Sequence, residues 1–351
     1  MNVNELFSAG AIAAYHQAAA GSTTPYVGAA LFPAAKKAGL DLKWFIGFGG
    51  MPVSLAPAVF DAKAKLRERV IPVGIETEMP FFREGFLLKE RDRQEILRAQ
   101  DSNDPYVQEI LARTFDDASD LIEGAEVAVE RMRMQLLAYG SISIESNGVL
   151  YEYNYDPNDS FRDNNYVAAP VAWSDPAADI LGDLQTAMDH TEENSGTRPA
   201  IAIMSRKTFG YLLKNTGVRS AVLAQNQTAN VFMSEAVVKQ ALVDLLGLTV
   251  IVYNKKYKNE EGETQQFYPD DMCTLLPEGN LGKTWYGTTP EEADLLGGAT
   301  NVQVKIVNTG VAVTTKVMDD PVNIKTIASE IVLPSWERMN ECCIINAGNL
   351  S

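Results

Sequence analysis

The residue types that carry most enzyme chemistry are few in this chain and do not stand in catalytic spacings. Of the two histidines, His16 lies in an alanine-rich stretch and His190 in the polar sequence DHTEENSG. The chain contains no HExxH, CxxC, glycine-rich phosphate-loop or GxSxG motif. A Ser-His-Asp triad would have to use one of these two imidazoles, and neither has a catalytic sequence context. The sequence therefore predicts no catalytic residue, no cofactor and no enzyme.

The three cysteines do not form a metal-binding or disulfide pattern. Cys342 and Cys343 are adjacent in the apolar sequence CCIINA, and Cys273 stands alone. An odd number with one adjacent pair favours a reduced, intracellular compartment. A zinc-thiolate site would need more ligands, so we expect buried, inert thiols and no metal.

The densest group of charged side chains is the segment VYNKKYKNEEGETQQFYPDDM, residues 252–272. A calcium loop places oxygen ligands at alternate positions and ends in a bidentate glutamate, and this segment does not match that spacing. It does match a strand, LTVIVYN, followed by a polar turn with Gly262 and a returning strand, QQFYP. The segment therefore predicts a hairpin rather than a metal or catalytic loop.

Bulk composition sets the class of protein. With 351 residues, the chain is expected to form two packed units or one elaborate fold. The net charge of −16 repels phosphate backbones, so specific nucleic-acid binding is not expected. No apolar run reaches the roughly 20 residues of a membrane span. The N-terminal stretch lacks the basic region of a secretory signal.

One long helix is the clearest predicted element. Asp104 can cap it, Pro105 suits the first helical position, and Gly140 suits its end. Apolar residues recur in steps of three and four to Tyr139. Its outer face is predicted to carry the acids Asp116, Asp117, Asp120, Glu123 and Glu130. Two interpretations of these acids stay open: a solvated face, or a docking surface for basic groups of a neighbouring molecule.

Residues 51–90 predict an extended, charged ribbon. Basic residues alternate along FDAKAKLRERV and acids along GIETEMPF, which is strand spacing. A turn at IPVG would pair Arg69 with Glu76 and Arg67 with Glu78 across the strands. A ribbon of two strands is marginal in water, so we expect it to lie on something else. The basic residues of the ribbon are Lys63, Lys65, Arg67 and Arg69.

The rest of the chain indicates an α+β fold. Residues 1–40 predict an arm with a short helix near 4–20. A hairpin is expected around Asn147-Gly148. Helices and strands alternate from 175 to 253, beginning with a helix at Asp175-Pro176, and strand character returns after residue 301.

The segment from 248 to 287 resembles the lambda-type major capsid protein E family of tailed bacteriophages. The resemblance rests on a tyrosine-bearing hairpin, a glycine turn, an aromatic-Pro-Asp step and an apolar strand. In this chain those residues are Tyr253, Tyr257, Gly262, Phe267, Pro269, Asp270, Leu275 and Leu276. The order of the ribbon, the long helix, the hairpin ending in EYNYDP and the late strands agrees with the same family, so the resemblance covers most of the chain.

The resemblance implies the HK97-like capsid fold. Its parts would be an N-terminal arm (1–40), an extended E-loop (41–100), a peripheral domain with a long spine helix (101–175 and 301–351) and an axial domain (176–300). Copies would join as hexamers and pentamers in an icosahedral shell that encloses double-stranded DNA without specific binding. Lys63 and Lys65 would then meet the acids of the long helix on an adjacent subunit.

The same resemblance implies partners and a location. The partners are other copies of the chain, a separate scaffolding protein, a portal and a decoration protein, with no membrane. The shell would be part of the virion and would assemble in the host cytoplasm. Two alternatives remain: an encapsulin-like compartment shell, and an enzyme that uses the 176–300 module.

Overall fold

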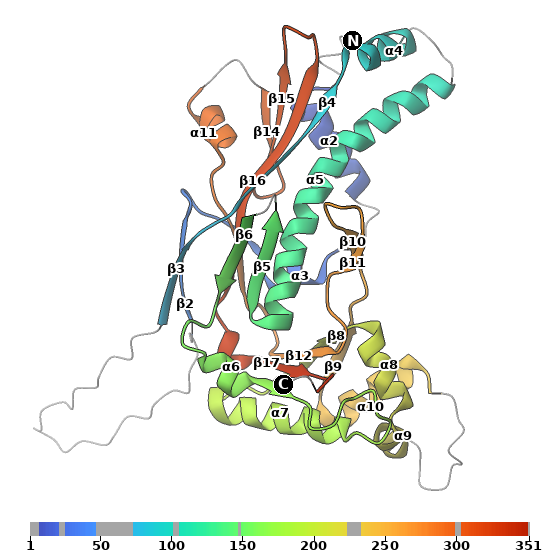
Figure 1. The fold of residues 1–351 in the computed structure, drawn as a ribbon, viewed down its shortest axis with the longest axis vertical. Coiled ribbons are helices and arrows are strands. Elements are labelled where there is room, and N and C mark those ends of the chain that lie inside the picture. Colours follow the sequence, from blue (N-terminus) through green and yellow to red (C-terminus); the bar gives the residue numbers. More distant parts are fainter. Residues whose placement is uncertain are drawn as a thin grey trace, which may run out of the picture. The chain divides into compact units, whose positions relative to one another are not determined.

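The fold is described by a computed structural model, which covers residues 7–20, 25–46, 73–100, 105–146, 149–222, 233–298 and 303–349 (Figure 1). These residues form two compact units, each assembled from separate stretches. Unit 1 takes the described residues of 1–42, 76–133 and 283–335, and unit 2 takes those of 43–75, 134–282 and 336–351. The four parts implied by the family resemblance have other boundaries than these two units, so that division stays a prediction.

Helices and strands occur in both units. The helices are α2 (Ala9–Ala20), α3 (Val27–Leu31), α4 (Glu90–Gln100), α5 (Pro105–Tyr139), α6 (Ser160–Asn165), α7 (Ile180–Ser195), α8 (Arg206–Lys214), α9 (Thr216–Val222), α10 (Glu235–Leu246), α11 (Pro290–Leu296) and the short 3-10 helix η1 (Met339–Glu341). The strands are β1 (Ala34–Lys36), β2 (Asp41–Ile46), β3 (Val73–Glu78), β4 (Phe81–Leu88), β5 (Ser141–Ser146), β6 (Val149–Asn154), β7 (Tyr166–Ala168), β8 (Ile201–Met204), β9 (Thr249–Val252), β10 (Lys256–Lys258), β11 (Thr264–Gln266), β12 (Met272–Leu276), β13 (Gly282–Tyr286), β14 (Gln303–Val307), β15 (Val311–Val317), β16 (Ile324–Trp336) and β17 (Cys343–Asn346). None of the helices in the described ranges is long and apolar enough to span a bilayer.

Helix α5 confirms the predicted long helix, with the same first and last residues. Its 35 residues correspond to about 52 Å at 1.5 Å per residue. The apolar stripe is buried at Ala118, Ile122 and Val129. Gly140 follows with a φ of +74°, and its N–H donates to the Leu136 carbonyl at 2.9 Å. Glycine adopts this left-handed conformation without steric cost, so the helix ends there.

Unit 1 is built on a sheet with the strand order β1-β13-β16-β15-β14, and β4 also pairs with β16. The predicted short N-terminal helix is present as α2. Its residues Ala9, Ile12 and Ala13 are buried in one cluster with residues of α5, β14, β15 and β16. Strand β1 pairs in parallel with β13. Helix α2 and strand β1 therefore both pack within unit 1, and the small alanine side chains of α2 allow a close approach.

The predicted ribbon of residues 51–90 is wrong for its last part. Strand β4 pairs antiparallel with β16 of the same chain over its whole length, from Phe81 opposite Ile331 to Leu88 opposite Ile324. This last part of the segment therefore pairs within its own chain, in the sheet of unit 1. Strand β3 pairs with β2. Residues 47–72, with all four basic residues of the ribbon, lie outside the described residues.

Unit 2 contains a five-stranded sheet with the order β7-β17-β12-β8-β9. Helices α7, α8, α9 and α10 contribute to one buried cluster with these strands. The α/β pattern predicted for this region is confirmed, as is the antiparallel hairpin of β5 and β6. Helix α7 begins later than predicted, at Ile180, because the Asp179 side chain accepts a hydrogen bond from the Gly182 N–H and caps it.

Candidate functional site

The cysteines do not offer a reactive thiol. Cys273, Cys342 and Cys343 are free and buried, as the apolar sequence around them predicted. Burial raises the pKa of the Cys343 thiol to about 12 and that of the other two still further. A thiolate, the nucleophilic form, is therefore strongly disfavoured at all three. Within the described ranges, no group of three His, Cys, Asp or Glu residues could hold a metal ion.

His16 does meet a serine and an acid, although its sequence context did not indicate it. Its Nδ1 lies 3.0 Å from Ser119 Oγ, and its Nε2 lies 3.8 Å from Glu126 Oε1. Ser119 and Glu126 both belong to α5, and His16 is buried where α2 packs against that helix. These contacts connect α2 to α5.

The charged segment 252–272 is a hairpin, as predicted. Strands β10 and β11 pair antiparallel, and Gly262 in the turn between them has a φ of +81°. At its base, the Phe267 ring packs at a tilt against Tyr257 and Tyr253, with ring centroids 4.8 and 6.2 Å away. These aromatic contacts pack the base of the hairpin.

The two aspartates after this hairpin bind to α8. Asp271 accepts hydrogen bonds from Lys207 Nζ at 2.9 Å and from the Tyr211 hydroxyl at 2.7 Å. Asp270 accepts a hydrogen bond from Ser205, the residue that caps α8. Although burial opposes it, the bonds from Lys207 and Tyr211 lower the pKa of Asp271. Both carboxylates thus anchor the hairpin and are not available as a separate site.

The acids predicted on the outer face of α5 lie on one exposed stripe. Asp116 is bound within its own chain, because the Tyr15 hydroxyl donates to it at 2.6 Å. Asp117, Asp120 and Glu123 form no ion pair with any residue in the described ranges. Partial burial, and then repulsion from Asp120 and Asp116, raises the pKa of Asp117. We call the three acids Asp117, Asp120 and Glu123 the acidic stripe.

A buried polar network in unit 1 was not predicted from the sequence. The prediction that Glu130 lies on the outer face of α5 is wrong, because this residue is fully buried in the network. Glu130 accepts a hydrogen bond from the Gly28 N–H at 3.0 Å and lies 3.4 Å from Arg133. Arg133 Nε donates to Thr284 Oγ1 at 3.0 Å, and the Thr284 hydroxyl donates to the Phe32 carbonyl at 2.8 Å. The network therefore connects α5 with the N-terminal segment and with β13.

Glu330 on β16 lies near this network without a hydrogen bond of its own. It is 1% exposed, and neither carboxylate oxygen has a partner among the described residues. Burial raises the pKa of Glu330 to about 8, although the Arg133 guanidinium opposes the rise and Glu126 adds to it. The carboxyl is therefore largely protonated at neutral pH.

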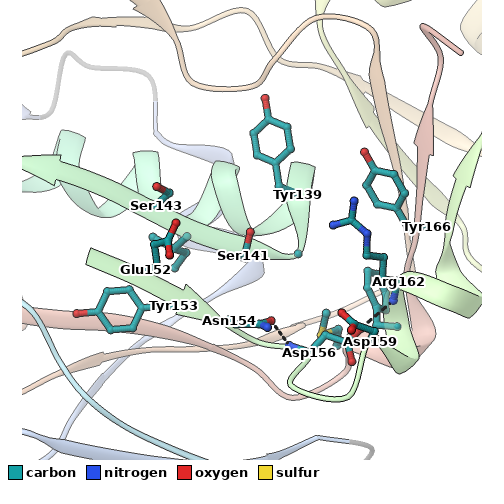
Figure 2. Close-up of a pocket in the computed structure, with 14 residues that line it drawn as sticks. Tyr139, Ser141, Ser143, Glu152, Tyr153, Asn154, Asp156, Asp159, Arg162 and Tyr166 are labelled. Carbon is teal, nitrogen blue, oxygen red and sulfur yellow. Dashed lines mark hydrogen bonds between the residues drawn. The ribbon is translucent and has the colours of Figure 1, made fainter. Parts of the chain in front are cut away.

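Unit 2 contains a pocket of about 250 Å³ beside the β5–β6 hairpin. Figure 2 shows Tyr139, Arg162 and Tyr166 gathered at one end, and Ser141, Ser143 and Glu152 from the two strands toward the other. The Arg162 guanidinium lies 5.5 Å from the centre of the Tyr166 ring. Hydroxyls, aromatic rings and one guanidinium can contact a polar protein segment. The pocket holds no histidine or cysteine that could act as a nucleophile or its base.

The predicted interface residues are therefore only partly brought together. The four α5 acids are neighbours, and Glu76 and Glu78 lie apart from them in the sequence, on β3. The pairing of Arg69 with Glu76 and of Arg67 with Glu78 stays a prediction, because both arginines lie outside the described residues. No local pattern indicated the bond between Arg133 and Thr284, which are 151 positions apart, and Arg162 was not identified from the sequence.

Comparison with known proteins gives a consistent result. Residues 26–347 match the model of the family described as phage major capsid protein E. No curated protein matches. Among solved structures, a prophage capsid protein from Escherichia coli CFT073 matches with a TM-score of 0.59 and 17% identity, covering 99% of each chain.

Two further solved structures have the same fold. A phage-related protein from Bordetella bronchiseptica RB50 has a TM-score of 0.56 and 12% identity over 98% of each chain. The cyanophage A-1(L) capsid protein has a TM-score of 0.52 and 12% identity over 93% of each chain. The architecture is thus the HK97-like capsid fold, as the resemblance of the hairpin segment implied.

Proposed function

The chain belongs to the phage major capsid protein E family and forms the shell of a virion, and on this premise we propose how its copies assemble. They join as hexamers and pentamers that close an icosahedral shell around double-stranded DNA. Assembly takes place in the host cytoplasm with a scaffolding protein, a portal and a decoration protein as further partners. The encapsulin-like and enzymatic alternatives are not favoured by the family match over residues 26–347.

The observation that supports this mode of assembly is the acidic stripe. Asp117, Asp120 and Glu123 are exposed on a rigid helix, and they repel one another at spacings of three residues. Within a single chain, repulsion among these acids does not stabilise the fold. A basic segment of an adjacent copy would relieve the repulsion, and Lys63 and Lys65 supply two positive charges at strand spacing.

Each contact contributes little free energy, but its repetition in every copy can stabilise the shell. An exposed ion pair contributes about 0–1 kcal/mol. A closed shell repeats the same contact in every copy, so modest pair energies accumulate over the assembly. The net charge of −16 per chain also disfavours binding of the wall to packaged DNA.

Charge reversal tests the interface. We expect K63E/K65E to lower the yield of shells in negative-stain images and in sedimentation, and D117K/D120K to do the same. Combining the two changes should recover part of the yield. The control is K256E/K258E, because these exposed lysines have the same spacing on strand β10. Parental yields from K63E/K65E would contradict the proposed contact.

The enclosed cargo is tested separately. Shells isolated from an infected or induced host should protect DNA from added nuclease. Shells that instead contain a protein cargo and no protected DNA would favour the encapsulin-like alternative. A dispersed monomer at every concentration would contradict the proposed assembly altogether.

A further inference from the structure

A second pocket, in unit 1, carries lysines that face each other without a counter-charge. It has a volume of about 470 Å³ and is lined by strands β4, β14, β15 and β16, by Met318 and by helix α11. Lys316 and Lys325 both line it, and they are direct cross-strand partners in the β15–β16 register. Like charges directly opposite each other destabilise a strand pair. Neither lysine forms an ion pair with a residue in the described ranges.

The other polar groups of the pocket do not neutralise the charge of the two lysines. Arg83 and Glu291 neutralise each other, with Arg83 Nη2 2.9 Å from Glu291 Oε1, and Ser329 donates to the same carboxylate. Asp294 is exposed at the rim on α11. The pocket therefore presents two uncompensated ammonium groups beside one exposed acid.

A buried hydroxyl in the pocket also lacks a partner. Thr314 lines the pocket, is 5% exposed, and its Oγ1 has no hydrogen bond to any described residue. Unsatisfied buried hydroxyls are uncommon in folded proteins, since each costs free energy. Together with Lys316 and Lys325, this hydroxyl forms a set of hydrogen-bond donors that suits a carboxylate.

The same chain displays a matching group on the turn between β15 and β16. Asp319 and Asp320 are exposed there and form no ion pair with a residue in the described ranges. Val322 beside them is 45% exposed, and Leu295 at the pocket is 44% exposed. The turn thus presents two acids and an apolar side chain, which complement the lysines and the leucine of the pocket.

This turn is held in one conformation by α4. The Val322 N–H donates to the Glu90 carboxylate at 2.8 Å, and the Arg93 guanidinium donates to the Val322 carbonyl at 2.8 Å. The Glu90 N–H donates to the Asn323 side chain at 3.1 Å. A turn that is already ordered loses little conformational entropy when it binds.

We propose that the acidic turn of one copy, Asp319 and Asp320, docks into the lysine pocket of a second copy, between Lys316 and Lys325. The inference rests on the proposed function, because it needs copies that assemble. The turn and the pocket are neighbouring parts of the β15–β16 hairpin, and the contact joins the turn of one copy to the pocket of another. Strands β15 and β16, which carry both surfaces, are seen side by side in Figure 1.

The test uses charge reversal in the full chain. D319K/D320K and K316D/K325D should each raise the protein concentration needed for half-assembly by about tenfold or more, because like charges would meet in the contact. The four changes together should return it to within about threefold of the parent. K305D is the matched control, since Lys305 is exposed on β14 opposite Val313, which belongs to the other face of the sheet.

Cross-linking tests the same contact even if the charge-reversal variants fold poorly. A D320C chain and a K325C chain are mixed, assembled and oxidised, so that a covalent dimer can form only between copies. The native cysteines are buried and should not compete. D320C with K305C is the control pair and should give no dimer above background.

The outcomes separate this contact from the proposed function. Parental assembly of D319K/D320K and of K316D/K325D, in a preparation whose parent forms shells, overturns the docking and leaves the shell intact. Absence of the D320C–K325C dimer in assembled shells overturns it too. A parent that never assembles overturns the proposed function and this contact with it.

Discussion

Replacement of Glu330 by glutamine should change how the stability of the folded chain depends on pH. Glu330 is buried at 1% exposure with no hydrogen bond from the described residues, and its pKa is about 8 against an ordinary value of 4.5. The folded chain therefore holds a proton that the unfolded chain has released. Stability from this group is complete below pH 4.5, declines as the pH rises from there, and is lost above pH 8.

The magnitude follows from linkage. Over the interval between the two pKa values, the free energy of unfolding falls by about 1.4 kcal/mol per pH unit. The whole interval is about 3.5 pH units, which corresponds to about 5 kcal/mol as an upper bound. Glutamine keeps the size of the side chain and removes the titration. We expect E330Q to be close to the parent or slightly less stable at pH 5, and several kcal/mol more stable at pH 8.

The assay is urea unfolding of unassembled chain between pH 5 and pH 8, followed by tryptophan fluorescence. The quantity compared is the difference in free energy of unfolding between variant and parent, which cancels the other titrating groups. E84Q is the matched control, since Glu84 is exposed on the neighbouring strand β4, and its profile should run parallel to the parent. Parallel profiles for E330Q and the parent would refute the reasoning, because Glu330 would then titrate normally.

Three further predictions follow from other contacts. R133M should destabilise unit 1 by about 3–5 kcal/mol, because it leaves the buried Glu130 carboxylate without its cation; an unchanged urea midpoint would contradict this. G310A should cost about 1–3 kcal/mol, since a Cβ would lie 2.3 Å from Tyr286. G124A, in the open middle of α5, should instead stabilise the folded chain by up to about 1 kcal/mol. A thermal melt in which G310A is more stable than G124A would contradict the packing argument. D120N should move the pKa of Asp117 back toward its ordinary value, because repulsion from Asp120 contributes to the rise; a carboxyl NMR titration identical to that of the parent would disprove it.

The elements read correctly from the sequence are those set by neighbours along the chain. Apolar spacing, a proline at the start and a glycine at the end predicted α5 with its observed bounds. Alternating residues about a glycine turn predicted the hairpins of β5–β6 and β10–β11. The order of such elements also carried the family resemblance, which the family match confirmed.

The sequence did not predict the pairing and burial that depend on segments far apart in the chain. Nothing in the sequence of Phe81–Leu88 indicates that its partner is β16 of the same chain. The burial of the alanine-rich helix α2 was not predicted either, since it depends on contacts with α5 and β15. Both segments join unit 1 through residues more than 100 positions away.

The sequence alone determined the type, length and order of the main elements and the excess of negative charge, because hydrogen-bonding periodicity and side-chain charge are properties of consecutive residues. Only the tertiary structure decided which charges remain without partners. Among the described residues, Glu330 is buried without a hydrogen-bond partner and Asp120 forms no ion pair. Lys316 and Lys325 oppose each other across two strands, and Asp116 is bound to Tyr15. Burial and pairing depend on segments far apart in the chain, and the fold brings those segments together.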